Sequence, residues 1–230
     1  MKIKKQKSLA TAKVLVVNVP KKKKTIVQQP SIVVDITLNG GIKNIMNVYL
    51  ASTKEVRETF GDWYYTASKE ISSLAEKYRM PKDVICAIVA VLSPGIKWKT
   101  NLGAAERVIT NALIFKTTEE KQLIAAYPRN VQLAQTILET GDVTKVNGPK
   151  VSVFYNSLLN PESQKSNLTL DGHAINIWRG EKVKLNSVKN MTKEERAKII
   201  FDYNVVADSL DITPQALQAI TWKVWQDLKF

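Results

Sequence analysis

The strongest constraint on the fold of this chain is the spacing of its apolar residues after Gly40–Gly41, a pair that we interpret as a break between elements. Beyond this pair, apolar side chains recur three and four positions apart, which is typical of helices with one buried face. The spacing predicts helices over residues 52–60, 63–79, 82–92, 101–114, 118–126, 130–139, 149–159, 171–180, 192–210 and 213–229. The expected fold class is therefore mostly α.

The first 38 residues follow a different pattern. They have no helical period, and Lys13–Val19 and Ser31–Leu38 are rich in Val and Ile, which predicts short strands and a small β element near the N-terminus. No acidic residue precedes Asp35, and Lys21–Lys24 form an unbroken run. Such a block is typical of a solvated, partly flexible tail, and contact with nucleic acid is a second interpretation.

The charge balance favours a polyanionic partner. The chain has 34 Lys and Arg residues against 21 Asp and Glu residues, so its net charge is +13. Basic side chains that neutralise phosphates release counterions, and this release drives association with nucleic acid whatever its base sequence. The alternative interpretation is that the charge only keeps the protein soluble.

Composition also narrows the class of protein. The single cysteine, Cys86, excludes an internal disulfide framework and a cysteine-held zinc site or cluster, and its apolar surroundings predict a core position. No apolar run is long enough to span a membrane, and no secretion signal follows the basic start. We expect a cytoplasmic monomer with no membrane partner, no metal and no cofactor.

A turn before the helix predicted at 149–159 has the features of a phosphate-binding hairpin. Asn147 and Gly148 permit positive φ, and Pro149 suits the first helical turn. A helix that begins this abruptly presents free N–H groups and its positive dipole end to an anion, and Lys145 and Lys150 flank the turn. An ordinary connection between helices, with solvent-facing lysines, would have the same pattern.

The segment Leu170-Asp171-Gly172-His173 places a carboxylate at the start of the next predicted helix. Asp is among the best N-cap residues, so capping alone would explain Asp171. His173 is the only histidine of the chain. A lone histidine beside an apolar helix is either a hydrogen-bonded structural residue or a base.

Taken together, Gly148-Pro149-Lys150 and Leu170-Asp171-Gly172-His173 resemble the helix-hairpin-helix DNA glycosylase superfamily. In that family a hairpin ending in Gly-x-Lys is followed, one helix and one loop later, by an aliphatic residue, Asp, any residue and His. Here Asp171 follows Lys150 by 21 positions. Residues 91–105 are similar to the family's helix ending in Leu-Ser, its DNA-facing loop and the small residues of its next helix. The resemblance covers about residues 82–180.

The resemblance implies a two-lobed helical fold. Residues 80–165 would form a helical barrel lobe that carries the helix-hairpin-helix, and residues 39–79 and 166–230 would form the second lobe. Lys150 would be the amine nucleophile that attacks the sugar C1′ and forms a Schiff base. Asp171 would stay ionised and stabilise the oxocarbenium-like sugar, and the target base would leave the stack to reach both.

The DNA-facing loop departs from the family pattern, because Gly95 stands where a Gln often fills the space of the flipped base. Trp98, between Lys97 and Lys99, is predicted to be a stacking wedge beside phosphate-binding lysines, with a buried aromatic as the alternative. The predicted DNA-binding residues are Lys145, Asn147, Gly148, Pro149, Lys97, Trp98, Lys99 and Asn101, and the predicted supporting residues are His173, Thr169 and Gln215.

The function implied is excision of a flipped, damaged or modified base from duplex DNA by an N-glycosylase, with or without AP-lyase activity, as in DNA repair. Relatives of the family act in DNA hypermodification, and the same cleft would serve that reaction. Small basic chains of this kind resemble phage-encoded proteins, for which the location would be the host cytoplasm. A non-catalytic helix-hairpin-helix DNA-binding protein, and a basic protein that binds RNA or another protein, are the remaining alternatives.

Overall fold

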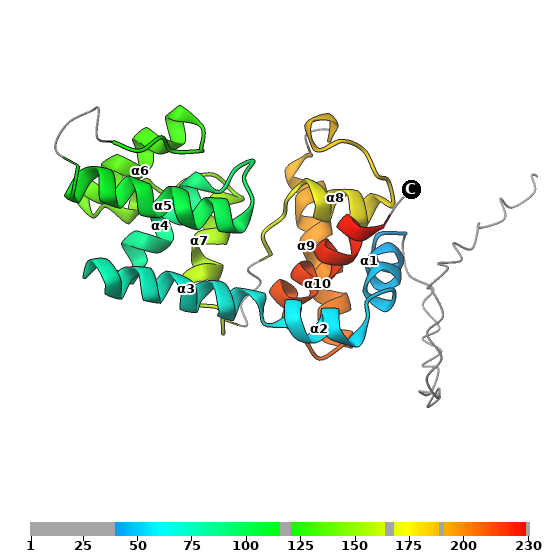
Figure 1. Cartoon of the computed structure of the whole chain (residues 1–230). Helices are drawn as coiled ribbons and strands as arrows, with labels where there is room; N and C mark the ends of the chain where they lie inside the picture. Colours follow the sequence, from blue (N-terminus) through cyan, green and yellow to red (C-terminus); the bar gives the residue numbers. More distant parts are fainter. Residues whose placement is uncertain (1–39, 116–120, 164–167, 189–190, 229–230) are drawn as a thin grey trace, which may run out of the picture. The chain divides into compact units, whose positions relative to one another are not determined.

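The computed structural model describes residues 40–115, 121–163, 168–188 and 191–228. Throughout these ranges the chain is mostly α-helical, and they contain no strand (Figure 1). The mostly α fold class is therefore confirmed. The N-terminal β element that we predicted lies outside the described residues.

The helices of the described ranges are α1 (Gly40–Leu50), α2 (Lys54–Gly61), α3 (Trp63–Tyr78), α4 (Lys82–Leu92), α5 (Trp98–Leu113), α6 (Pro128–Thr140), α7 (Val151–Leu159), α8 (Gly172–Arg179), α9 (Lys193–Ser209) and α10 (Pro214–Asp227). Two short 3-10 helices, η1 (Val143–Lys145) and η2 (Leu185–Ser187), lie in the connections. Capping sets several of these boundaries. Helices α2, α8, α9 and α10 each follow an N-cap residue whose side chain accepts a hydrogen bond from the backbone N–H three residues later. These N-cap residues are Thr53, Asp171, Thr192 and Thr213.

Helix α1 is missing from the predicted helices, although the helical pattern was expected to begin after Gly40–Gly41. Both glycines lie inside α1, and a Cβ at Gly41 would collide with the indole of Trp178 on α8. That indole is fixed, because its Nε1 donates to Asp202 Oδ2 over 2.7 Å. The glycine therefore lets two helices approach closely, a use that has no signature in the local sequence.

The helix predicted over 118–126 is also wrong for the part of it that the structure describes, since residues 121–126 are not helical. Asn111 of α5 holds this segment instead. Its side-chain oxygen accepts from the backbone N–H of Gln122 over 2.9 Å, and its Nδ2 donates to the Gln122 carbonyl over 2.8 Å. Helix α5 begins at Trp98, earlier than predicted, and α7 begins at Val151, two residues later.

Two clusters of buried apolar side chains form the core. The first is built around α4, of which residues 84–92 are all buried, and it includes side chains of α3, α5, α6 and α7. The second includes side chains of α1, α8, α9 and α10. The clusters meet where Phe60 of α2 packs against both, and Ala219 of α10 belongs to the first.

The first testable expectation concerns Cys86, the only cysteine. Its side chain is buried in α4, and burial raises the pKa of the thiol to about 12. Because the thiolate is the reactive form, we expect slow reaction with a disulfide reagent in the native protein at mildly alkaline pH, and rapid stoichiometric reaction in guanidinium. Rapid labelling of the folded chain would show that α4 is not covered on this side.

Candidate functional site

The predicted hairpin lies on the surface. Gly148 has φ of 90°, in the left-handed region, as the Asn-Gly pair predicted. The backbone closes through a hydrogen bond from Ser152 N to the Gly148 carbonyl over 3.0 Å. Lys150 is the residue before α7, and no side chain caps the helix. Residues 147–150 are exposed, and of the first N–H groups of α7 that of Ser152 is already engaged by the Gly148 carbonyl.

Two basic residues of the hairpin region are engaged with the protein itself. Arg196 of α9 donates through Nη2 to the Pro149 carbonyl over 3.0 Å, which ties the hairpin to the start of α9. Sequence reasoning missed this contact, because its residues are 47 positions apart. Lys145, predicted to bind DNA, lies 3.5 Å from Asp142 through Nζ, so part of its charge is balanced within the hairpin region.

Asp171 caps α8, as the capping interpretation expects. Its Oδ1 accepts from the backbone N–H of Ala174 over 2.9 Å, and the residue is partly exposed. The negative charge of the carboxylate also raises the pKa of two buried phenols, those of Tyr64 and Tyr203. Burial is the main cause that raises the pKa of Tyr203, and the negative charge of Asp171 raises it further.

Four buried polar side chains form what we call the polar cluster: Tyr64 of α3, which is near enough to Asp171 to feel its charge, Thr169, and Gln215 and Gln218 of α10. Tyr64 Oη donates to Gln218 Oε1 over 3.1 Å, and Gln215 Nε2 donates to the Ser163 carbonyl over 3.0 Å. The pKa of Tyr64 is raised above its ordinary value. Burial is the main cause, the Thr169 hydroxyl acts in the opposite direction, and the charge of Asp171 adds to the increase. The two glutamines are three residues apart and thus share one face of α10.

Two atoms of the polar cluster lack hydrogen-bond partners among the described residues. Thr169 Oγ1 lies close enough to Tyr64 to influence its pKa, but no hydrogen bond of ordinary geometry joins them. Gln215 Oε1 has no partner either, although Gln215 is only 1% exposed. Buried polar atoms are almost always paired, because an unpaired one loses its hydration without compensation. The polar cluster therefore holds two buried atoms whose hydrogen-bonding capacity no described residue fills.

Lys150 and Asp171 form no ion pair among the described residues. Phe154 lies one helical turn after Lys150, and its ring centroid is 6.3 Å from that of Tyr64. This aromatic contact joins α7 to the polar cluster, while Lys150 itself is exposed before α7.

The predicted wedge residue Trp98 is part of the first core cluster's edge. Its ring centroid lies 5.2 Å from that of Trp63, and its Nε1 donates to Glu70 Oε2 over 2.5 Å. Trp98 is half-buried, packed against the first core cluster with part of its surface exposed. Lys97 is exposed before α5, and Lys99 borders a second pocket that Glu70 and Glu106 also line.

Asn101 requires a correction. We predicted that it binds DNA, but it is 1% exposed, and its Nδ2 donates to the Val89 carbonyl over 3.0 Å. Its amide ties α5 to α4, so direct contact with DNA is excluded by burial. His173, a predicted supporting residue, is partly buried and packs edge to face against Trp222 at 6.1 Å.

Comparison with known proteins assigns the family. The chain belongs to the family of unknown function DUF7178, whose model matches residues 28–229. The comparison with curated proteins gives no match, and the comparison with solved structures gives none. In the described ranges, no helix is long and apolar enough to cross a membrane, and no group of three or more His, Cys, Asp or Glu residues is placed to hold a metal ion.

The polar cluster generates the second expectation, on Thr169→Val. Replacing an unpaired buried hydroxyl by a methyl group should raise the free energy of unfolding by about 1 kcal/mol, because the desolvation cost disappears. The matched control is Thr221→Val, whose hydroxyl donates to Leu217 O over 2.8 Å and whose loss should lower stability by about 1 kcal/mol. Urea unfolding measures both. Equal destabilisation by the two substitutions would mean that the Thr169 hydroxyl is satisfied in the folded protein.

Asp171 gives the third expectation. Asn and Asp are equally good N-caps, whereas Ala costs about 1 kcal/mol. We therefore expect Asp171→Ala to lower the free energy of unfolding of the chain by about that amount, and Asp171→Asn to change it by only a few tenths. If Asp171→Asn were as destabilising as Asp171→Ala, the charge rather than the cap would be the structural contribution of this residue.

Proposed function

We propose that the protein binds duplex DNA and cleaves the N-glycosidic bond of a damaged or modified base that is flipped out to meet Asp171 and Lys150. The observation that carries the proposal is the polar cluster, in which two buried atoms without partners lie on side chains grouped beside the partly exposed Asp171 carboxylate. A nucleobase edge offers alternating donors and acceptors that would satisfy such atoms. The resemblance to helix-hairpin-helix DNA glycosylases supports the same assignment.

DNA binding is supported by charge and by the hairpin. The net charge of +13 favours association with phosphates. The exposed turn at Gly148, with the uncapped start of α7 behind it, suits a phosphate group of the backbone. Lys150 and Arg196 add positive charge at this place. The proposal also includes a two-lobed arrangement like that of the helix-hairpin-helix DNA glycosylases, with the cleft at the junction of α3 and α10.

The reaction assigns a separate role to each residue. The Asp171 carboxylate, held by the Ala174 N–H, stabilises the positive charge that develops on the sugar as the C1′–N bond breaks. The base leaves with the bonding electron pair and takes up a proton. The Lys150 amine bonds to C1′ and loses a proton, and the sugar O4′ then leaves C1′ as an alcohol, which gives the Schiff base. Because Lys150 is exposed in the free protein, the bound DNA must desolvate it.

One observation favours a second candidate, a non-catalytic helix-hairpin-helix DNA-binding protein. Lys150 is exposed and makes no ion pair with Asp171 among the described residues. An exposed lysine beside a hairpin would bind phosphate without any further chemistry. The two candidates differ in whether a covalent intermediate forms and whether a base is released or altered.

The fourth expectation is a covalent complex that depends on Lys150. Borohydride should trap the wild-type protein on a duplex with an abasic site, and Lys150→Ala should abolish trapping while it retains salt-dependent binding. Lys43→Ala, which removes an exposed lysine of α1, is the matched control and should trap like wild type. Asp171→Asn should slow base release.

Mass spectrometry of genomic DNA treated with the protein identifies the base. A free base indicates excision, and a base altered in place indicates hypermodification through the same site. Equal trapping by Lys150→Ala and wild type would show that Lys150 is not the nucleophile. Salt-dependent binding with neither trapping, release nor alteration would favour the non-catalytic candidate.

A further inference from the structure

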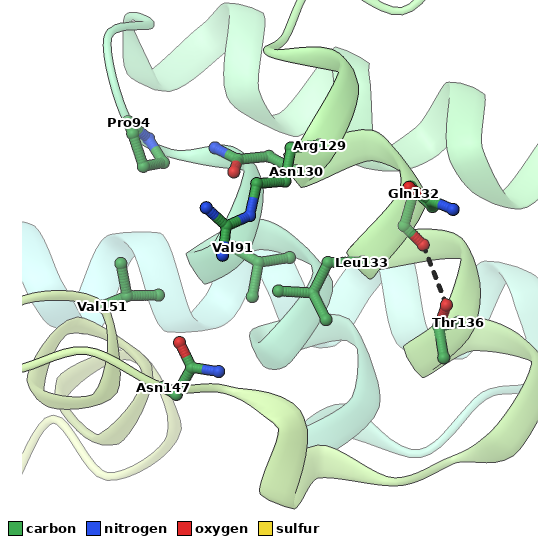
Figure 2. Close-up of a pocket in the computed structure, with 9 residues that line it drawn as sticks. All are labelled: Val91, Pro94, Arg129, Asn130, Gln132, Leu133, Thr136, Asn147 and Val151. Atoms are coloured by element: carbon green, nitrogen blue, oxygen red, sulfur yellow. Dashed lines mark hydrogen bonds between the residues drawn. The ribbon is translucent and has the colours of Figure 1, made fainter.

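A separate pocket opens beside the hairpin (Figure 2). Its volume is about 430 Å³, within the range of small-molecule sites. The end of α4, the first two turns of α6 and the hairpin line it. Neither Lys150, Asp171 nor any residue of the polar cluster lines it, so it is distinct from the site described above.

Part of the pocket lining is apolar. Val91 of α4, Leu133 of α6, Val151 of α7 and Pro94 contribute to it (Figure 2). Leu133 and Val151 are half-buried, whereas Val91 is only 3% exposed, so the first two offer more of the accessible aliphatic surface. Such a surface suits the flat face of a planar ring, because burying it removes apolar area from water.

The rim of the pocket is polar and carries side-chain amides. Asn130 and Gln132 of α6 and Asn147 of the hairpin line it. An amide offers both a donor and an acceptor, which matches the edge of a nucleobase. Asn147 is also part of the turn that we propose to bind phosphate, so a ligand in the pocket would adjoin that phosphate.

Arg129 supplies positive charge to the same rim. Its guanidinium extends over the pocket beside Val91 (Figure 2). It is exposed and makes no ion pair with any described residue, and no acidic side chain lines the pocket. A free guanidinium in this position can bind two oxygens of one phosphate at once.

We propose that this pocket binds one unpaired nucleotide: the base lies on the aliphatic surface, the amides contact its edge, and Arg129 binds its phosphate. The proposal rests on the proposed function only in that the nucleotide belongs to a DNA strand held by the hairpin. The pocket takes a nucleotide next to the processed one, and it is not the place of the reaction.

The fifth expectation compares two labelled duplexes of the same sequence, one fully paired and one with a single-nucleotide bulge, by fluorescence anisotropy. Wild type should bind the bulged duplex at least about tenfold more tightly, since one charge-assisted hydrogen bond contributes that much. Arg129→Gln and Asn147→Ala should lose this preference. Arg107→Gln, which removes an arginine of α5 outside the pocket, should keep it.

Two further arms separate this proposal from the catalytic one. Binding of free deoxynucleoside monophosphates, followed by ligand-observed NMR, should occur with wild type and be lost with Arg129→Gln. Trapping on an abasic site should be unaffected by Arg129→Gln on a paired duplex at saturating protein. Binding of duplex DNA without a bulge preference would overturn the pocket and leave the catalytic proposal intact. A bulge preference without trapping would overturn the catalytic proposal and leave the pocket proposal intact. Failure to bind either bulged DNA or mononucleotides would overturn the pocket proposal.

Discussion

Helix α4 imposes the arrangement on which the hairpin and its neighbouring pocket depend. All residues from Val84 to Leu92 are buried, and a helix that is apolar on every face must be covered on every face. Helices α3, α5, α6 and α7 provide that cover. Because α7 must pack against α4, the turn before it is fixed at the end of α4, and α6 is brought to the same place. The hairpin is thus held by core packing, although its own residues are exposed.

The junction of α3 with α10 differs from the surroundings of α4, because its buried side chains include polar ones. Here the chain buries Tyr64, Gln215 and Gln218 in positions where apolar residues would pack with less cost. One hydrogen bond, from Tyr64 to Gln218, satisfies part of this group, but Thr169 Oγ1 and Gln215 Oε1 are left without partners in the described ranges. The rule that buried polar atoms are paired is often broken at functional sites. The two unpaired atoms, rather than any motif, are the physical reason for proposing a functional site at this junction.

Features that depend on local chemistry could be predicted from the sequence. The Asn-Gly pair predicted the positive φ of Gly148, and the capping preference of Asp predicted the start of α8. Contacts between distant residues could not be predicted in this way. Tyr64 and Gln218 are 154 positions apart, so nothing near either residue indicates the other.

Two further roles could not be predicted, for the same reason. The sequence around Gly41 does not show that Trp178 of α8 lies against it. Asn101 was assigned to DNA, because the polar side chain at the start of a helix gives no sign that it is buried against the Val89 carbonyl. In both cases a residue whose type is ambiguous acquired its role from a tertiary contact. The candidate catalytic pair rests on a sequence pattern, while the polar cluster was visible only once the helices were packed.

The two proposed sites share the hairpin and the start of α7. Lys150 is exposed just before α7, and the ring of Phe154, one helical turn further on, lies 6.3 Å from that of Tyr64 in the polar cluster. Val151, together with Asn147, lines the nucleotide-sized pocket. A strand whose phosphate lies on the hairpin would therefore adjoin both sites. The same phosphate contact would position the base to be processed and its neighbour, so the geometry of the turn would set the distance between them.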